Sequence, residues 1–337
     1  MLTVSGKKDG FALVVVILVM LLASFLASHL IMKVRAELKI TAKYRQRAIG
    51  RLLAEGGISL ALFRLKDKPD LDFDELLDGS VFLQGYPYET VLPNGKIKYY
   101  AVAESGKINL NSTSFGLIEK FLEYHGLEVE EVRVVVDSLR DWRDNDNLYR
   151  LDGAEQEYYQ ELERPYIPRN GKIEDPAEFF LIRGTESLKG LFDPYEVFTV
   201  NSKGNQINIS SLTPELLDFL TGGQKTLQEE YYEQLKLGNG RITKASLQGI
   251  IGGSYSSLQN YLTDRPTRSN LFSITAYGYE GDFSEATLLS EEKGEADELS
   301  EDEEPTTYYP GTKVRVMVDT TNKGNGIKYL SWKEQHI

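Results

Sequence analysis

The chain has 337 residues and a formal net charge of −13, with 51 acidic and 38 basic side chains. This balance argues against a nucleic-acid partner, because phosphate binding requires a basic surface, and it is compatible with cations or basic proteins. The chain contains no cysteine, which excludes disulfides and thiolate metal sites. Its length predicts two or three compact units, and a hydrophobic content of 41% is enough for a sizeable core.

An uncharged, strongly apolar run covers residues 11–32 and follows a short polar leader, residues 1–10. As a helix of about 1.5 Å per residue, this run is about 33 Å long, which spans the roughly 30 Å hydrocarbon core of a bilayer. The Gly10-Phe11 pair precedes the apolar run, whereas a secretory signal is cut after it. Cleavage at this pair would therefore leave the helix on the mature protein. The alternative is a simple membrane anchor in which the pair has no such role.

Helical spacing of apolar residues continues beyond the run, and no proline occurs before Pro69. The pattern predicts one helix over about 11–66. The pair Gly56-Gly57 is a weak point in this helix. The alternative is a membrane span followed by a separate helix.

Strand patterns lie on both sides of a long helical block. Residues 80–104 alternate and are rich in aromatics, with Pro93-Asn94-Gly95 as a hairpin turn. Residues 107–200 and a stretch near 212 have helical patterns, and strand character returns at 271–283, 312–320 and 327–333. Because the strand segments lie far apart in the sequence, the helical block is predicted to be inserted into one sheet.

A faint internal repeat aligns residues 107–122 with residues 206–220 at an offset of 99. Both copies run Ile-Asn, a short polar turn, and a helix preceded by Ser or Thr, which are preferred N-cap residues. Some small nucleic-acid-binding modules use such helix pairs, but the acidic charge of this chain favours an architectural use.

The segment 291–304 is strongly acidic, with nine acids and one lysine. It is predicted to be a solvated, disordered loop between two strands, and a cation-binding segment is the alternative.

Further acids gather at residues 141–155, and hard cations such as Ca²⁺ bind carboxylate oxygens. With Asp144 as position 1, Asp146 and Glu155 fall at positions 3 and 12 of an EF-hand loop. Tyr149, however, stands at position 6, where the EF-hand requires glycine. The segment is either a calcium loop of another shape or a set of solvated acids around a helix end.

Catalysis has little support in the sequence. The three histidines, His29, His125 and His336, form no grouping with cysteine or acid at metal-ligand or triad spacing. No phosphate-binding glycine loop occurs. The chain is predicted not to be an enzyme; paired carboxylates keep a membrane-anchored hydrolase as a distant alternative.

Several short motifs recur along the chain in a fixed order: Gly10-Phe11 with the apolar run, residues 106–114, 137–147, 152–159 and 164–173, and a second Ile-Asn-Ile-Ser at 207–210. In this order and spacing they resemble the protein K family of the general (type II) secretion pathway, its largest minor pseudopilin. The leader resembles the class III leader of type IV pilins and pseudopilins, which a prepilin peptidase cuts after the glycine and methylates.

The resemblance implies an α+β fold, in which a pilin-like N-terminal helix packs on an antiparallel sheet and a helical domain is inserted into that sheet. The expected parts in chain order are a leader (1–10), a transmembrane half-helix (11–32), a stalk with the first strands (33–105), an inserted domain with two helix-hairpin-like repeats (106–265), and returning strands (266–337) that enclose a disordered loop (291–305).

It also implies a role at the tip of a periplasmic pseudopilus, initiating or capping assembly and supporting protein export. The implied partners are the minor pseudopilins I and J, the major pseudopilin filament, the prepilin peptidase and the inner-membrane secretion platform. The chain would cross the inner membrane once, with its C-terminal domain in the periplasm. A tip minor pilin of a type IV pilus is the alternative.

Two further implications concern single residues. Major pilins carry a glutamate five residues into the mature chain, whereas this chain has Val15 there. The protein K family, which this chain resembles, also lacks this glutamate. Its absence fits a tip subunit on which no further subunit stacks. The family's calcium-binding Asp-rich segment maps onto Asp141, Asp144, Asp146 and Glu155, which are the predicted Ca²⁺ ligands.

Overall fold

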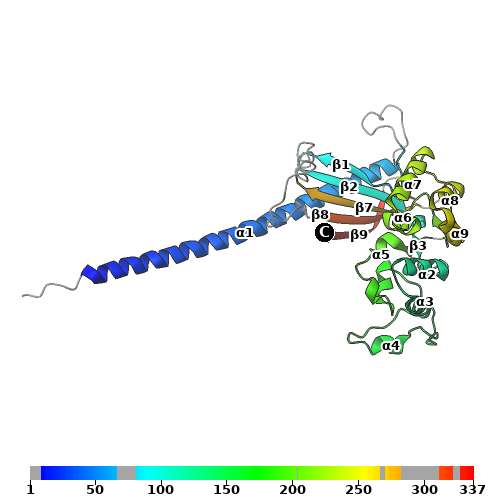
Figure 1. Cartoon of the computed structure of the whole chain (residues 1–337), viewed down its shortest axis with the longest axis horizontal. Coiled ribbons are helices and arrows are strands. Elements are labelled where there is room, and N and C mark those ends of the chain that lie inside the picture. The colour runs from blue at the N-terminus through cyan, green and yellow to red at the C-terminus, as the bar shows by residue number, and fades with distance from the viewer. Residues whose placement is uncertain (1–8, 67–80, 203, 266–269, 282–310, 322–326) are drawn as a thin grey trace, which may run out of the picture.

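A computed structural model describes residues 9–66, 81–202, 204–265, 270–281, 311–321 and 327–337. Helix α1 (Asp9–Lys66) is continuous and extends far from the rest of the molecule (Figure 1). The predicted single N-terminal helix is therefore confirmed. Most of the leader and the acidic segment 291–304 lie outside the described residues.

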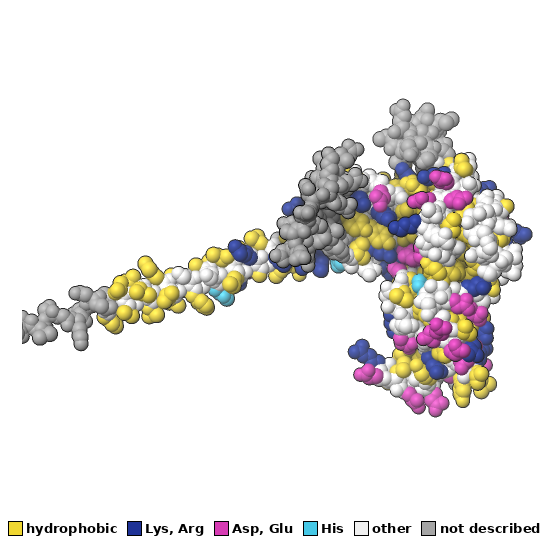
Figure 2. All heavy atoms as spheres, viewed as in Figure 1, with side chains coloured by type: hydrophobic (Ala, Val, Ile, Leu, Met, Phe, Trp, Pro, Cys, Tyr) yellow, Lys and Arg dark blue, Asp and Glu magenta, His cyan; other side chains and the backbone are white. Residues whose placement is uncertain are grey.

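The free part of α1 is apolar and exposed, as the yellow side chains of Figure 2 show. In the described part of the chain, α1 is the one helix long and apolar enough to cross a membrane, judged by length and composition. Its C-terminal part is different, because Ala54, Ile58 and Ala61 are buried against the sheet.

Two glycines of α1 allow the helix to lie directly on the sheet. A Cβ atom on Gly57 would lie 2.8 Å from a methyl carbon of Ile97 and 2.9 Å from the Cβ of Ala276. A Cβ atom on Gly278 of the sheet would lie 2.0 Å from the carbonyl oxygen of Gly50. The pair Gly56-Gly57 does not interrupt the helix, because the packing on the sheet holds this segment in place.

The sheet has five antiparallel strands in the order β1-β2-β7-β8-β9. Pro93-Asn94 joins the first two strands in a tight hairpin, with Leu92 opposite Gly95. Residues 81–87 are irregular, with one turn at 84–85, rather than the predicted start of a strand. The strand bounds are β1 (Tyr88–Leu92), β2 (Gly95–Ala103), β7 (Leu271–Glu280), β8 (Gly311–Asp319) and β9 (Lys328–His336).

Strands β2 and β7 are neighbours in the sheet, although they flank the whole helical block in sequence. The α+β fold with a helical domain inserted into the sheet is confirmed. Figure 1 shows the inserted domain, in green and yellow, at the end of the sheet remote from the free end of α1.

The inserted domain consists of short helices around its own hydrophobic core. Its helices are shorter than the block predicted over 107–200, because long loops separate α3, α4 and α5. They are α2 (Phe115–Tyr124), α3 (Val129–Arg143), α4 (Gln156–Gln160), α5 (Pro194–Val197), α6 (Pro214–Thr221), α7 (Lys225–Leu237), α8 (Lys244–Ile251) and α9 (Tyr255–Leu258). Short 3-10 helices are η2 (Glu104–Gly106), η3 (Pro176–Leu181), η4 (Glu186–Leu188), η5 (Gly252–Ser254) and η6 (Gln259–Tyr261).

The two segments that align at an offset of 99 residues adopt the same backbone pattern. In each, a two-residue strand makes a parallel pair with a later strand and leads into a helix pair, α2 and α3 or α6 and α7. The N–H of Leu110 donates to the carbonyl of Thr199, and the N–H of Ile209 donates to the carbonyl of Thr263, both at 3.0 Å. The short strands are β3 (Ile108–Asn109), β4 (Phe198–Thr199), β5 (Ile207–Asn208) and β6 (Leu262–Thr263).

The face of the sheet away from α1 carries charges that bind the inserted domain. Successive side chains of a strand point to opposite faces, so Val314 and Val316 of β8 pack toward α1 while Lys313 and Arg315 point the other way. The Arg315 guanidinium lies 2.7 Å from Asp193 and also contacts Glu196, and the Lys313 ammonium lies 2.9 Å from Asp193. Ion pairs thus connect α5 and its N-cap residue Asp193 to the sheet.

Burial raises the pKa of the Asp193 carboxyl, but the hydrogen bonds and positive charge of Arg315 and Lys313 outweigh burial and lower it well below its usual range. This carboxylate is therefore ionised in the folded protein, and its two cationic partners stabilise it at a partly buried position.

Candidate metal site in the inserted domain

Helix α3 positions two acidic side chains at its C-terminal end. The helix begins with a capping box between Glu128 and Glu131, which satisfies N–H groups at its start. Its apolar side packs into the core of the inserted domain, and Asp141 lies on that same buried side, 0% exposed. Asp144 caps the helix, and a spacing of three residues places its side chain beside that of Asp141.

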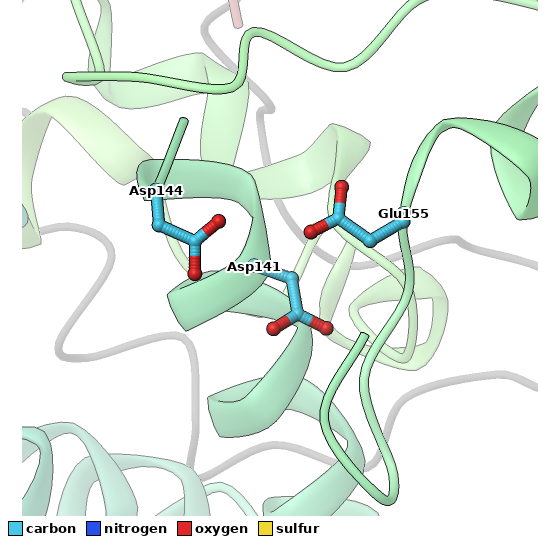
Figure 3. Close-up of side chains that lie close together, drawn as sticks. All are labelled: Asp141, Asp144 and Glu155. Atoms are coloured by element: carbon cyan, nitrogen blue, oxygen red, sulfur yellow. The ribbon is translucent and has the colours of Figure 1, made fainter. Parts of the chain in front are cut away.

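The third acid, Glu155, comes from the loop after α3 and is the N-cap residue of α4. It is 5% exposed. One carboxylate oxygen each from Asp141, Asp144 and Glu155 lies within 4.8 Å of the other two, and Figure 3 shows the three side chains around one point. We call these three residues the carboxylate cluster.

The loop approaches α3 closely because residue 153 is glycine. A Cβ atom on Gly153 would lie 1.9 Å from Oδ2 of Asp141. Any other residue at this position would push the loop, and Glu155 with it, away from the helix.

Arg150 is the cation that contacts the carboxylate cluster. Its guanidinium Nη1 donates to Asp144 at 2.8 Å and to Asp141, and its backbone N–H donates to Oδ2 of Asp141 at 3.1 Å. In contrast, no described residue donates a hydrogen bond to either oxygen of Glu155 or to Oδ1 of Asp144, although all three atoms are buried. Three acceptor atoms are thus left without a donor, an arrangement that normally costs free energy.

The electrostatics of the cluster agree with this geometry. Burial raises the pKa of the Glu155 carboxyl to about 7, with further increases from the charges of Asp141, Asp144 and Asp146. One guanidinium therefore does not compensate three carboxylates. An oxygen-only donor set of this kind suits a hard divalent cation such as Ca²⁺ or Mg²⁺, so the residues present fit the predicted ion.

Asp146 is the predicted ligand that the structure does not bring into the cluster. Its side chain is exposed, and its Oδ1 accepts a hydrogen bond from the N–H of Leu148 at 2.9 Å. Asp146 therefore contributes its charge to the site without offering a clustered ligand atom.

The sequence interpretation missed Arg150, and it missed the contacts that hold the end of α3. The indole N–H of Trp142 donates to Glu178 at 3.4 Å, and Arg169 binds the same carboxylate at 2.6 Å. The N–H of Gly171 also donates to the carbonyl of Trp142 at 3.1 Å. The segment around residues 169–171 thus fixes the helix end that carries the cluster.

The predicted processing residues lie at the start of α1. Gly10 is in the first turn of the helix and Phe11 is 74% exposed. Cleavage between them stays a prediction.

Comparisons with known proteins bear on the same part of the chain. A family model described as "Type II secretion system (T2SS), protein K" matches residues 101–189, which include α2, α3 and the whole carboxylate cluster. The predicted resemblance to the protein K family is confirmed. Protein K of Klebsiella pneumoniae is 31% identical over 117 residues, which are 34% of this chain and 36% of that protein. Protein K of Aeromonas hydrophila is 28% identical over 237 residues, which are 62% of this chain and 69% of that protein.

The matched segment thus spans about a third of the Klebsiella protein K. A solved structure of the GspK-GspI-GspJ complex from enterotoxigenic Escherichia coli is also similar, with 14% identity and a TM-score of 0.46. That match covers 90% of this chain and 99% of the matched one.

The raised pKa of Glu155 gives a prediction for the metal-free protein. Between about pH 4.5 and pH 7 the folded state holds a proton on Glu155 that the unfolded state has lost, so stability falls as pH rises through this window. We expect Glu155→Gln to remove this loss of stability with rising pH. The metal-free variant is then more stable than the wild type at pH 7.5, by on the order of 1–3 kcal/mol. The measurement is chemical denaturation of the chelator-treated full chain in detergent from pH 4.5 to 7.5.

The matched control is Glu157→Gln, since Glu157 is exposed and lies two residues away. It is expected to follow the wild-type pH profile. A Glu155→Gln variant with the wild-type profile would contradict the assigned charge state of the cluster.

Proposed function

We propose that this chain is a minor pseudopilin of a type II secretion system, which initiates or caps the pseudopilus and so supports protein export across the outer membrane. The observation that carries the proposal is the place of the family match. Residues 101–189 form much of a domain inserted between neighbouring strands of a sheet, and this sheet packs on a helix that is able to cross a membrane.

The proposed location is the inner membrane, crossed once by the apolar part of α1, with the C-terminal domain in the periplasm. The exposed apolar surface of α1 supports it, because side chains such as Leu18 and Leu26 are well over half exposed. Such a surface is stable in a lipid environment, and a large exposed apolar patch is unusual in water.

Two features support a position at the tip of a filament. Residues 11–32 carry no carboxylate, and Val15 stands where major pilins have the glutamate that pairs with the next subunit. The inserted domain also adds bulk at the end of the sheet remote from the free end of α1 (Figure 1). Another subunit stacked above would have to accommodate this domain.

The proposed partners are the minor pseudopilins I and J, the major pseudopilin filament, the prepilin peptidase and the inner-membrane secretion platform. In the similar Escherichia coli structure, GspK is in a complex with GspI and GspJ. For this chain the partners follow from the proposed family role. A tip minor pilin of a type IV pilus, with the same fold, is the second candidate.

The proposed role is structural, without enzymatic activity. We further propose that the carboxylate cluster binds Ca²⁺, with Asp141, Asp144 and Glu155 as ligands. The three buried acceptor atoms without donors support this assignment. A bound divalent cation would offset the negative charge, and Arg150 would then no longer be needed as the counter-ion.

The first prediction concerns secretion. In a host strain that lacks protein K, with the remaining secretion genes taken from the source of this chain, the full chain is expected to restore the extracellular level of an exported protein. A variant lacking residues 104–270, with β2 joined to β7 by a short linker, is expected to reach the membrane without restoring export. Unchanged pilus-dependent adhesion in the same strain would separate this role from a type IV pilus role. Absence of rescue by the full chain, correctly inserted, would contradict the proposal.

The second prediction concerns the N-terminus. The intact mass of the chain from native membranes is expected to correspond to a start at methylated Phe11. The matched control is Gly10→Val, which keeps the apolar character and should leave the leader attached. If the wild-type chain retains its leader in a host with active prepilin peptidase, the result would contradict the pseudopilin assignment.

A further inference from the structure

A basic pocket lies beside the carboxylate cluster, and the cluster does not account for it. The pocket has a volume of about 650 Å³, and four basic side chains and one acid line it. This is unusual in a chain with a net charge of −13. The basic residues are Arg140, Arg143, Arg150 and Lys172, and Phe115 at the start of α2 forms an apolar wall.

Arg143 has no acidic partner in the described part of the chain. Its Nη2 donates to the carbonyl of Asn111 at 2.6 Å, whereas its Nη1 is buried and has no hydrogen-bond partner among the described residues. Its guanidinium carbon lies 5.2 Å from the centre of the Phe115 ring, and that of Arg140 lies 4.5 Å from the same ring. Burial lowers the pKa of Arg143. The positive charge of Arg143, which lines the pocket, is therefore not compensated by an acidic partner of its own.

Lys172 also lines the pocket, and it is exposed and makes no ion pair with a described residue. The loop that carries it is fixed, because the side chain of Asn111 exchanges two hydrogen bonds with the backbone of Ile173, at 2.8 and 2.9 Å. Arg140 differs from both, since it pairs with Asp137 at 3.2 Å. Arg143 and Lys172 are thus the two cations available to a ligand.

Arg150 belongs to both the pocket and the carboxylate cluster. It neutralises Asp141 and Asp144, and its side chain is 39% exposed. A divalent cation bound by these carboxylates would replace those contacts, and the guanidinium could then turn into the pocket. Occupancy of the cation site would in this way add a third cation to the pocket.

We propose that the pocket binds an oxyanion group of a larger ligand, a carboxylate or a phosphate-type group, through Arg143 and Lys172. Affinity rises when a divalent cation occupies the cluster, because Arg150 is released. Guanidinium groups bind such anions through paired hydrogen bonds, and the volume is in the range of binding pockets. The coupling, though not the anion site itself, rests on the proposed calcium role.

The test uses the full chain in detergent, with acetate and sulfate as probes at constant ionic strength. Trp142 directly precedes Arg143, so its fluorescence reports binding in a Trp332→Phe background, in which it is the only tryptophan. Without calcium, Arg143→Gln and Lys172→Gln are expected to raise the Kd at least fivefold. The matched control Arg133→Gln changes an exposed arginine of the same helix and is expected to keep the original Kd.

With calcium present, we expect the Kd of the unsubstituted pocket to fall at least fivefold, which is at the lower end of typical coupling between two sites. Arg150→Gln is expected to abolish this effect, because the proposed coupling acts through Arg150. Tighter binding of acetate identifies a carboxylate ligand, and tighter binding of sulfate a phosphate-type one; either supports the proposal. No saturable binding, or a Kd unchanged in both Arg143→Gln and Lys172→Gln, overturns the anion site.

Lys172 is exposed, so Lys172→Gln tests the site even if Arg143→Gln unfolds the domain. Binding that depends on both residues but ignores calcium overturns the coupling alone. The titration without calcium is independent of the metal proposal, so failure of one is distinguishable from failure of the other.

Discussion

In the described part of the chain, three carboxylates lie together at the end of α3 with one guanidinium. The architecture of the first half of the inserted domain depends on how this charge is balanced. Asp141 is completely buried within the core side of the helix, and Glu155 has no hydrogen-bond donor among the described residues. An uncompensated buried charge is strongly destabilising. A bound cation would resolve this imbalance and would connect α3 to the loop that leads into α4.

Close contacts on both faces of the sheet connect the inserted domain to helix α1. Gly50, Gly57 and Gly278 let α1 lie against the sheet at backbone distance, and the charges of β8 bind α5 on the opposite face. A buried pair of Lys107 and Glu104, 2.8 Å apart, adds a contact where the chain leaves β2. Helix, sheet and insert therefore form a continuous path of close contacts from α1 to the inserted domain that carries the carboxylate cluster.

The sequence predicts the elements whose patterns are local and leaves out those that depend on tertiary contact. Apolar periodicity predicts α1 and the strands, and the separation of the strands predicts the insertion. The sequence marks Gly56-Gly57 as a weak point, because the effect of the sheet on Gly57 is not visible in a local pattern. Asp146 and Glu155 look equivalent in the sequence, but the close approach at Gly153 buries only Glu155. The alternation of charged and apolar residues along β8 could have indicated that Lys313 and Arg315 point to the face of the sheet away from α1.

Terbium luminescence is the measurement that tests the central claim most directly, since Tb³⁺ occupies oxygen-ligand calcium sites and Trp142, next to Asp141, can sensitise its emission. In the full chain with Trp332→Phe, we predict saturable emission with one ion per chain, displacement by Ca²⁺, and loss of the signal in Glu155→Gln but not in Glu157→Gln. Absence of emission from the folded wild-type cluster, or equal emission from the Glu155→Gln variant, would contradict the account.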